Sequence, residues 1–282
     1  MATVNARIMR VAFQGEPGAF SEAAAMQLLG DAITTVPRRT FDSTFQAITE
    51  GAADALLVPV ENSLAGSIVR VYDLLVESGL TVAAETILPI EHHLIGCPGA
   101  TLHGIRAVSS HPMALAQCEH FFAARPELKR IAAEDTAGSV REVLDRGDKT
   151  HAAIAARRAA EYYHATILQE GIQDAAENYT RFVLLLPPEA AKQFAAVALK
   201  MSLALRLAHR PGALLAALQS FAAHGVNLLK IESRPIHGRP WEYQFFVDVE
   251  ADNPQSLEAA LTKARLAVSE LRVLGRYAPA NR

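Results

Sequence analysis

The chain has 282 residues, of which 50% are hydrophobic, and a formal net charge of -3. This length suits about two domains, and the hydrophobic content excludes a largely disordered chain. The near balance of charge, with no run of Lys and Arg, argues against nucleic acid as a partner. No apolar run reaches the roughly 18 residues of a membrane-spanning helix, and the N-terminal run is too short for a signal peptide. We therefore expect a soluble, cytoplasmic protein without a membrane partner.

Short apolar runs alternate with helix-like segments through the first two thirds of the chain. The runs predict strands at residues 8–13, 34–37, 55–60, 81–90, 107–109, 130–133, 151–154 and 182–186. Helices are predicted between them at residues 21–29, 43–50, 68–78, 114–123, 138–145 and 157–162. This alternation predicts an α/β sheet that is covered by helices on both faces.

The pattern changes after the stretch PPEAAKQ, residues 187–193, so we expect one domain at residues 1–190 and another at residues 191–282. In the second domain, Pro211 suits the first turn of a helix whose apolar stripe includes Leu218 and Ala222. The predicted elements are a half-buried strand at 197–207, a helix after Pro211, strands at 226–232 and 243–250, a helix from Asn253 and a strand at 270–276. The order βαββαβ predicts a ferredoxin-like module.

Four loops of the first domain carry small or polar residues directly after predicted strands, and the first is GEPGAFS, residues 15–21. Gly15 and Gly18 permit a tight turn whose backbone N–H groups face outward. The helix that begins near Ser21 offers its N-terminus to an anion. An ordinary turn between a strand and a helix is the alternative interpretation of this loop.

The second loop is PVENSLAGS, residues 59–67. It places the polar side chains of Glu61, Asn62 and Ser63 directly after a buried strand. Gly66 permits close approach of the backbone to a ligand, and another helix follows with its N-terminus. Helix capping alone could equally account for these polar side chains.

The third loop lies in SSHPMALAQC, residues 109–118. Ser110 is predicted to be the N-cap of a helix that has Pro112 in its first turn. Gln117 would then lie about two turns along the helix. His111 is a candidate general base or metal ligand.

The remaining motif types argue against a cofactor. His92, His93 and His111 share no metal-ligand spacing, and HExxH is absent, so no metal is expected. Glycine-rich nucleotide motifs and the GxSxG nucleophile motif are absent as well. Cys97 and Cys118 form no CxxC pair and are predicted to be reduced, buried thiols.

The fourth loop, NYTRF at residues 178–182, leads straight into a buried strand. It brings together the Thr180 hydroxyl, the Arg181 guanidinium and the Phe182 ring. Ligands of open sheets bind at strand ends, and this set of groups suits a small carboxylated ring. A structural ion pair for Arg181 is the alternative.

In this order, the four loops resemble the prephenate dehydratase family. Two further segments match, EDTAGSV at 134–140 and AAIAARRAA at 152–160. The C-terminal module resembles the ACT domain of bacterial members, through RPGALLAAL at 210–218 and NLLKIESRP at 227–235. Met113 and Ala19 depart from the residues that the family more often has. Neither departure removes a group that the chemistry needs, although Ala19 lacks one hydroxyl donor near the anion site.

The resemblance implies a carbon–oxygen lyase of phenylalanine biosynthesis. Such an enzyme converts prephenate to phenylpyruvate with loss of carbon dioxide and water, and it needs no cofactor. The implied catalytic region has two α/β subdomains facing across a cleft, like a periplasmic binding protein, with the second at residues 90–170. Nothing resembling a chorismate mutase helix bundle precedes residue 8, so we expect a monofunctional enzyme.

The resemblance also implies roles for the loop residues. Thr180 would hydrogen-bond to the departing hydroxyl or protonate it, Arg181 would bind a substrate carboxylate, and Phe182 would shape the ring pocket. A threonine hydroxyl is a very poor acid, so full proton transfer would need a relay through Glu61 or water. The other implied residues are Asn62, Ser110 and Gln117 in the catalytic set and Ser63, Gly66, Gly15, Gly18 and Ser21 in the substrate-binding set.

The ACT resemblance implies feedback inhibition by L-phenylalanine. The implied effector-binding residues are Gly212, Ala213, Leu214, Asn227, Leu228, Glu232, Ser233 and Arg234. Asn227 would contact the polar head of the amino acid across an interface between two modules. Because such pairing covers exposed strand edges, a homodimer or homotetramer is expected. A plain helix start and a plain strand end are the alternative interpretations of these segments.

Two other functions are compatible with the same motifs. In an arogenate dehydratase, an amino group replaces the keto oxygen of the substrate, and the residues that distinguish the two substrates cannot be placed. A catalytically inactive amino-acid sensor would keep the cleft and lose the chemistry. The intact Thr180, Arg181 and Phe182 argue against the sensor, as does the lack of a DNA-binding segment.

Overall fold

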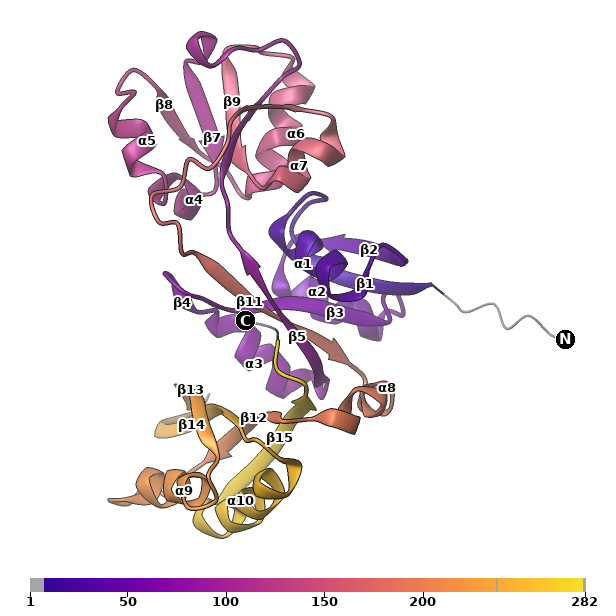
Figure 1. The fold of residues 1–282 in the computed structure, drawn as a ribbon, viewed down its shortest axis with the longest axis vertical. Coiled ribbons are helices and arrows are strands. Elements are labelled where there is room, and N and C mark those ends of the chain that lie inside the picture. Colours follow the sequence, from indigo (N-terminus) through magenta and orange to yellow (C-terminus); the bar gives the residue numbers. More distant parts are fainter. Residues whose placement is uncertain (1–7, 237, 281–282) are drawn as a thin grey trace, which may run out of the picture. The chain divides into compact units, whose positions relative to one another are not determined.

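The computed structural model describes residues 8–236 and 238–280, and it divides into two compact units (Figure 1). The first unit comprises the residues up to Gly66 together with Ile87–Phe182. The second comprises Ser67–Thr86 together with the residues from Val183 onward. Each unit is therefore assembled from two separate stretches of the chain.

The first unit contains a sheet built from the N-terminal strands. Its members are β1 (Met9–Gln14), β2 (Ile33–Arg38), β3 (Ala55–Asn62) and the start of β11 (Tyr179–Leu186), in the order β11-β3-β1-β2. β1 pairs in parallel with both β2 and β3, and helix α1 (Phe20–Leu29) packs against it. Since parallel strands end at the same edge of a sheet, the loops after β1 and β3 emerge at one edge.

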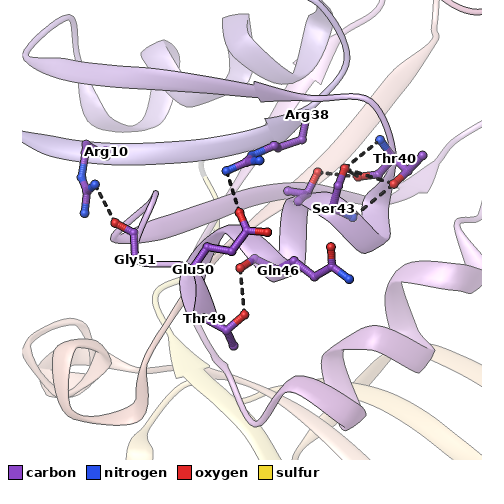
Figure 2. Close-up of polar contacts among 9 residues, drawn as sticks. Arg10, Arg38, Thr40, Ser43, Gln46, Thr49, Glu50 and Gly51 are labelled. Atoms are coloured by element: carbon purple, nitrogen blue, oxygen red, sulfur yellow. Dashed lines mark hydrogen bonds and ion pairs between the residues drawn. The ribbon is translucent and has the colours of Figure 1, made fainter.

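Helix α2 (Phe41–Thr49) begins two residues earlier than predicted because its N-terminus is capped (Figure 2). Thr40 accepts a hydrogen bond from the Ser43 backbone N–H at 3.1 Å, and the Ser43 hydroxyl accepts one from the Thr40 N–H at 3.2 Å. This reciprocal capping box satisfies two N–H groups that a helix start leaves open. Beyond the other end, Glu50 forms an ion pair with Arg38 of β2 at 3.1 Å.

A second sheet of the first unit has helices on both faces (Figure 1). Its order is β10-β6-β9-β7-β8, with β9 paired to β6 and β7. The strands are β6 (His93–Gly96), β7 (Ala107–Ser110), β8 (Lys129–Ala132), β9 (His151–Ala155) and β10 (Thr166–Gln169). The helices are η1 (Leu102–Gly104), α4 (Pro112–Ala116), α5 (Glu119–Ala123), α6 (Thr136–Arg146) and α7 (Arg157–Tyr163).

Two sequence expectations in this region were wrong, and two short strands were not predicted. The helix predicted at 114–123 is two short helices, α4 and α5, because the chain leaves helical geometry at Gln117 and Cys118. Ser110 is not the N-cap: His111 is, and its Nδ1 accepts from the Met113 N–H at 3.2 Å. Strands β6 and β10 were not predicted, since each has only four residues and lies close to predicted elements.

The second unit has the order βαββαβ that the sequence predicts for its C-terminal part. Its sheet runs β13-β14-β12-β15-β5, and α9 and α10 pack together on one face. The elements are α3 (Val69–Ser78), β5 (Thr81–Pro89), α8 (Pro188–Ala191), η2 (Lys192–Val197), β12 (Lys200–Arg206), α9 (Ala213–Ala222), β13 (Asn227–Ile236), β14 (Arg239–Glu250), α10 (Pro254–Ala267) and β15 (Glu270–Tyr277), with the two-residue β4 (Gly66–Ser67) before α3. The predicted α/β class and ferredoxin-like module are confirmed.

Helix α9 differs from the expectation at its start and on its face. Pro211 precedes the helix, whose N-cap is Gly212 in the left-handed conformation (φ 78°). Only a residue tolerant of positive φ fits this position without strain. Ala222, predicted in the apolar stripe, is exposed, whereas Ala217 and Phe221 are buried.

Strand β5, from the earlier stretch of the second unit, lies directly against β15. Gly275 pairs with Val82, and a Cβ on Gly275 would come within 2.2 Å of the Val82 carbonyl oxygen. Such a distance is far below van der Waals contact, so only glycine fits here. On the same sheet, Lys200 of β12 forms a buried ion pair with Glu85 of β5, with Nζ–O distances of 2.8 and 2.9 Å.

In the part of the chain that the structure describes, no helix is long and apolar enough to span a membrane. Cys97 and Cys118 are free and buried, as predicted. Burial raises the pKa of the Cys118 thiol to about 12, so this thiol stays protonated at neutral pH.

Candidate functional site

Asn62, at the end of β3, is the centre of a hydrogen-bond network in the first unit. Its Nδ2 lies 2.7 Å from Asn178 Oδ1, 2.9 Å from Thr180 Oγ1 and 3.1 Å from the Tyr179 carbonyl oxygen. Asn178 is 2% exposed and Thr180 is 7% exposed. The structure thus brings together two predicted site loops whose members are more than 100 positions apart in sequence.

The backbone determines which way the Asn62 amide points. Asn62 Oδ1 accepts hydrogen bonds from the N–H groups of Leu64 at 3.0 Å and Ala65 at 2.8 Å. A backbone N–H can only donate, so the atom facing these two groups must be the amide oxygen. Nδ2 is therefore the atom that faces Asn178 and Thr180, and it donates to both.

This direction leaves the Thr180 proton available to a ligand. Thr180 Oγ1 accepts from Asn62, and among the residues that the structure describes its hydroxyl proton has no acceptor. A hydroxyl has one proton to donate, so the Thr180 O–H can serve an acceptor atom of a bound molecule. The accepted bond from Asn62 also polarises the hydroxyl and strengthens its donation.

The network continues from Asn178 to Gln117 and His92. Because Asn178 Oδ1 faces Asn62, its Nδ2 donates to Gln117 Oε1 at 3.3 Å. Gln117 Oε1 also lies 2.8 Å from His92 Nε2. An oxygen can only accept, so His92 must carry its proton on Nε2. Gln117 is half-buried, at the break between α4 and α5.

The other residues of these two loops lie beside the network. Ser63 and Tyr179 exchange two hydrogen bonds: the Ser63 N–H donates to the Tyr179 carbonyl at 2.8 Å, and the Tyr179 N–H donates to Ser63 Oγ at 2.9 Å. These bonds place the start of β11 at the end of β3. Glu61 and Arg181 are half-buried, and Phe182 is buried. Gly66 is exposed with a positive φ of 80°.

The GEPGAFS loop forms the tight turn that its glycines predict. Gly15 and Gly18 have φ values of 122° and 90°, and a Cβ on Gly18 would come within 2.6 Å of Ala159 Cα in α7. The Gly18 N–H donates to the buried carboxylate of Glu22 at 2.8 Å, which holds the turn. Ser21 is buried in the first turn of α1.

This loop reaches the network through an aromatic contact. The Phe20 ring packs edge-on against the His92 imidazole, with centroids 5.6 Å apart and an interplanar angle of 82°. Ser110, by contrast, is fully buried, and its hydroxyl donates to the Ile154 carbonyl at 2.6 Å. The structure therefore uses the Ser110 hydroxyl to join β7 to β9.

A polar pocket of about 380 Å³ lies at one end of the same loop. Two ion pairs cross it, Arg141 with Glu16 at 2.7 Å and Arg39 with Glu134 at 2.8 Å. Neither here nor elsewhere among the described residues is a group of three His, Cys, Asp or Glu side chains arranged to hold a metal ion. Both arginines of this pocket are thus paired with carboxylates of the pocket itself.

Three residues of the effector set line two neighbouring pockets of the second unit. Ala213 and Leu214 line a pocket of about 170 Å³, and Arg234 lines one of about 620 Å³. Trp241, which is 78% exposed, lines both. Gly212 caps α9, and Asn227 and Leu228 begin β13.

The Glu232–Arg234 segment also contacts α3 and Ser67 of β4. Glu232 accepts a hydrogen bond from the Ser67 hydroxyl at 2.7 Å, and Arg234 pairs with Asp73 at 3.0 Å. Ser233, between them, is exposed because side chains alternate along a strand. Two predicted effector residues thus already have protein partners in the single chain.

Three histidines of the first unit are buried without a carboxylate partner that would offset the burial. Burial lowers the pKa of His92, His93 and His151 below the ordinary value of 6.5, and the positive charges of Arg157 and Arg146 lower it further for the latter two. Near neutral pH these imidazoles are therefore uncharged. His151 Nε2 lies 2.7 Å from Ser109 Oγ, a buried pair that joins β9 to β7.

We expect the free energy of unfolding to fall as the pH is lowered from 7.5 to 5.5. Below about pH 6.5 the unfolded chain binds protons that the folded imidazoles do not, so stability is present at higher pH and lost as the pH falls. Each histidine contributes a slope of at most about 1.4 kcal/mol per pH unit. Urea denaturation at the two pH values measures the loss, and His92→Gln should reduce it. Equal stability at both values would contradict this prediction.

The comparison with known proteins covers nearly the whole chain. A family model described as prephenate dehydratase matches residues 11–190, and one described as the ACT domain matches residues 201–265. The chain belongs to the prephenate dehydratase family. Arogenate dehydratase 3, chloroplastic, from Arabidopsis thaliana is 40% identical to it over 291 residues, which cover 95% of this chain and 67% of the plant protein.

Two solved structures show the same fold over 96% of this prephenate dehydratase family member. Prephenate dehydratase from Arthrobacter aurescens, in complex with L-Phe, is 32% identical, with a TM-score of 0.84 over 96% of this chain and 90% of that one. A structure described as GqqA, a novel type of quorum quenching acylase, is 35% identical, with a TM-score of 0.87 over 96% of this chain and 98% of that one.

His92 and Asn178 belong to the hydrogen-bond network, but the sequence alone did not indicate a site role for either residue. Asn178 belongs to the quoted NYTRF stretch, and its position beside Thr180 was a usable signal. His92 was considered only as a metal ligand. No local pattern marks it, because its partner Gln117 is 25 positions away in sequence.

Proposed function

We propose that this member of the family is a prephenate dehydratase that L-phenylalanine inhibits through the ACT domain. The observation that carries the proposal is the direction of the Asn62–Thr180 hydrogen bond, which leaves the Thr180 proton free to donate. The reaction breaks a carbon–oxygen bond as hydroxide departs from the ring. A donor at that oxygen is the group that the chemistry most needs.

The proposed reaction is a decarboxylating elimination. Electrons of the bond between the ring and its carboxylate enter the ring, carbon dioxide leaves, and the hydroxyl departs from the opposite carbon. That hydroxyl takes one proton, relayed from solvent through water or Glu61, and leaves as water, and the aromatic product is phenylpyruvate. Thr180 donates a hydrogen bond that strengthens as negative charge develops on the leaving oxygen, so it stabilises the transition state more than the ground state.

Arg181 suits the carboxylate of the keto-acid side chain better than the ring carboxylate. The ring carboxylate loses its charge as carbon dioxide forms, so an arginine bound to it would stabilise the ground state and slow the reaction. The side-chain carboxylate keeps its charge throughout. Binding there orients the ring without opposing the chemistry, and the neighbouring Phe182 supports the ring.

The effector proposal rests on the ACT domain and on the relative that was solved with L-Phe. The pockets beside Ala213, Leu214 and Arg234 are of a size for an amino acid or part of one. β13 is an edge strand of ten residues. Pairing two such edges would bury their open hydrogen-bonding groups, so we propose a homo-oligomer, and we place the enzyme in the cytoplasm.

The test supplies the purified protein with prephenate and, separately, with arogenate, each with and without phenylalanine. We expect phenylpyruvate from prephenate and a lower rate when phenylalanine is present. If only arogenate gave product, arogenate would be the substrate, and the proposed mechanism would still apply. No product from either, with phenylalanine still bound, would identify an inactive amino-acid sensor. Light scattering of the same sample measures the oligomeric state.

Acyl transfer, suggested by the relative described as an acylase, has less support in this chain. Among the described residues, Ser109 and His151 form a hydrogen-bonded pair of a serine hydroxyl and a histidine ring, as a serine nucleophile with a base would require. These two side chains are only 6% and 7% exposed, inside a sheet. We therefore assign this pair a structural role.

A further inference from the structure

His92 is almost completely buried, with 2% of its surface exposed, yet only one of its ring nitrogens has a partner. Nε2 bonds to Gln117, while Nδ1 has no hydrogen-bond partner among the described residues. A buried polar atom without a partner costs stability. An apolar ring at this position, beside Phe20, would avoid the cost. His92 is therefore less favourable for stability than an apolar ring would be, which indicates that this histidine has a functional role.

The hydrogen bonds of the Gln117 amide indicate what that role is. Its oxygen already accepts two hydrogen bonds, from Asn178 at 3.3 Å and from His92 at 2.8 Å. Its nitrogen carries two protons and has no partner in the described parts of the chain. If the amide turned over, its protons would meet the proton of Asn178, and His92 would have to move its proton from Nε2 to Nδ1, which has no acceptor among the described residues. The two donors thus hold Gln117 with its N–H groups, and not its oxygen, available to a ligand.

We propose that His92 is a positioning residue that keeps the Gln117 amide facing the substrate as a hydrogen-bond donor. The proposal rests on the proposed function in that the substrate is taken to be prephenate. Thr180 and Gln117 would then each present a hydrogen-bond donor to prephenate, whose polar atoms are all oxygens. The backbone N–H groups of Leu64 and Ala65 set the direction of every hydrogen bond in the network, up to the bond between Gln117 and His92.

Enzyme kinetics test the proposal with His92→Phe, His92→Gln and Gln117→Ala. In His92→Phe we expect kcat/KM for prephenate to fall about tenfold, the order of one lost hydrogen bond, while Tm stays equal or rises. His92→Gln should recover most of the loss, since its amide N–H can replace Nε2–H. Combined with Gln117→Ala, His92→Phe should cause no further loss, because it acts through Gln117.

Three results would overturn the proposal: an unchanged kcat/KM in His92→Phe, equal losses in the Phe and Gln variants, or additive losses in the double variant. The ¹⁵N spectrum of histidine-labelled protein gives a readout that needs no activity, with the signal assigned by its absence in His92→Gln. We expect the Nε2–H tautomer for His92. If the protein does not act on prephenate but this tautomer is present, the substrate is wrong and the orientation of Gln117 stands. The Nδ1–H tautomer would refute that orientation.

Discussion

Replacing Thr180 with alanine is expected to lower kcat for prephenate by roughly 10²-fold or more while the substrate still binds. The hydroxyl accepts from Asn62 and keeps its own proton for the ligand, so its loss removes a donor that acts mainly in the transition state. The fold should tolerate the change. Asn62 keeps two acceptors, Asn178 and the Tyr179 carbonyl.

Thr180→Ser is the matched control, because serine keeps the hydroxyl and loses only a methyl group. We expect it to retain most of the activity. Steady-state kinetics give kcat and KM for both variants, and binding of prephenate to the alanine variant is measured directly by calorimetry. A turnover of Thr180→Ala within threefold of the wild type would remove Thr180 from the mechanism.

The buried ion pair of the second unit supports the prediction with the largest expected effect on stability. Lys200 and Glu85 are 6% and 5% exposed, and Glu85 also accepts from the Ala280 N–H at 2.9 Å. Lys200→Met would leave the Glu85 carboxylate buried without its lysine. We expect the free energy of unfolding to fall by about 3–5 kcal/mol, as measured by urea denaturation at pH 7.5.

Two variants control for this effect. In the double variant Lys200→Met with Glu85→Leu, no charge remains buried, and most of the stability should return. Lys192→Met removes an exposed partner of Glu189, with 69% and 84% of the two side chains exposed, and should cost less than about 1 kcal/mol. If Lys200→Met lowered the free energy of unfolding no more than Lys192→Met, burial of the Lys200–Glu85 pair would have no effect on stability.

Much of the architecture follows from local patterns in the sequence. Apolar runs marked β1, β3, β9 and β11 within one to three residues, and period-2 alternation marked β12. These strands are long or fully buried, so their side chains repeat a clear pattern. Glycine and polar residues after β1 and β3 marked the two loops that emerge at one edge of the sheet. The meeting of Asn62 with Thr180 was inferred through the family resemblance.

The rest depends on contacts that no local pattern encodes. The roles of Asn178 and His92 come from hydrogen bonds to residues distant in sequence, and their direction comes from two backbone N–H groups. The break of the predicted helix at Gln117 is invisible in an alternation of apolar residues. It matters because this break places the Gln117 side chain between His92 and Asn178. Likewise, the ordinary sequence of β5 gives no sign that β15 pairs with it.

The pairing of β5 with β15 means that the regulatory segment cannot be treated as a detachable module. Cutting the chain near residue 190 would remove Lys200 from Glu85 and Gly275 from Val82, and it would expose the surfaces of α3 and β5 that belong to the second unit. A truncated enzyme that lost activity would therefore report damage to that unit as readily as loss of control. Experiments that separate catalysis from regulation in this protein call for single substitutions in the intact chain.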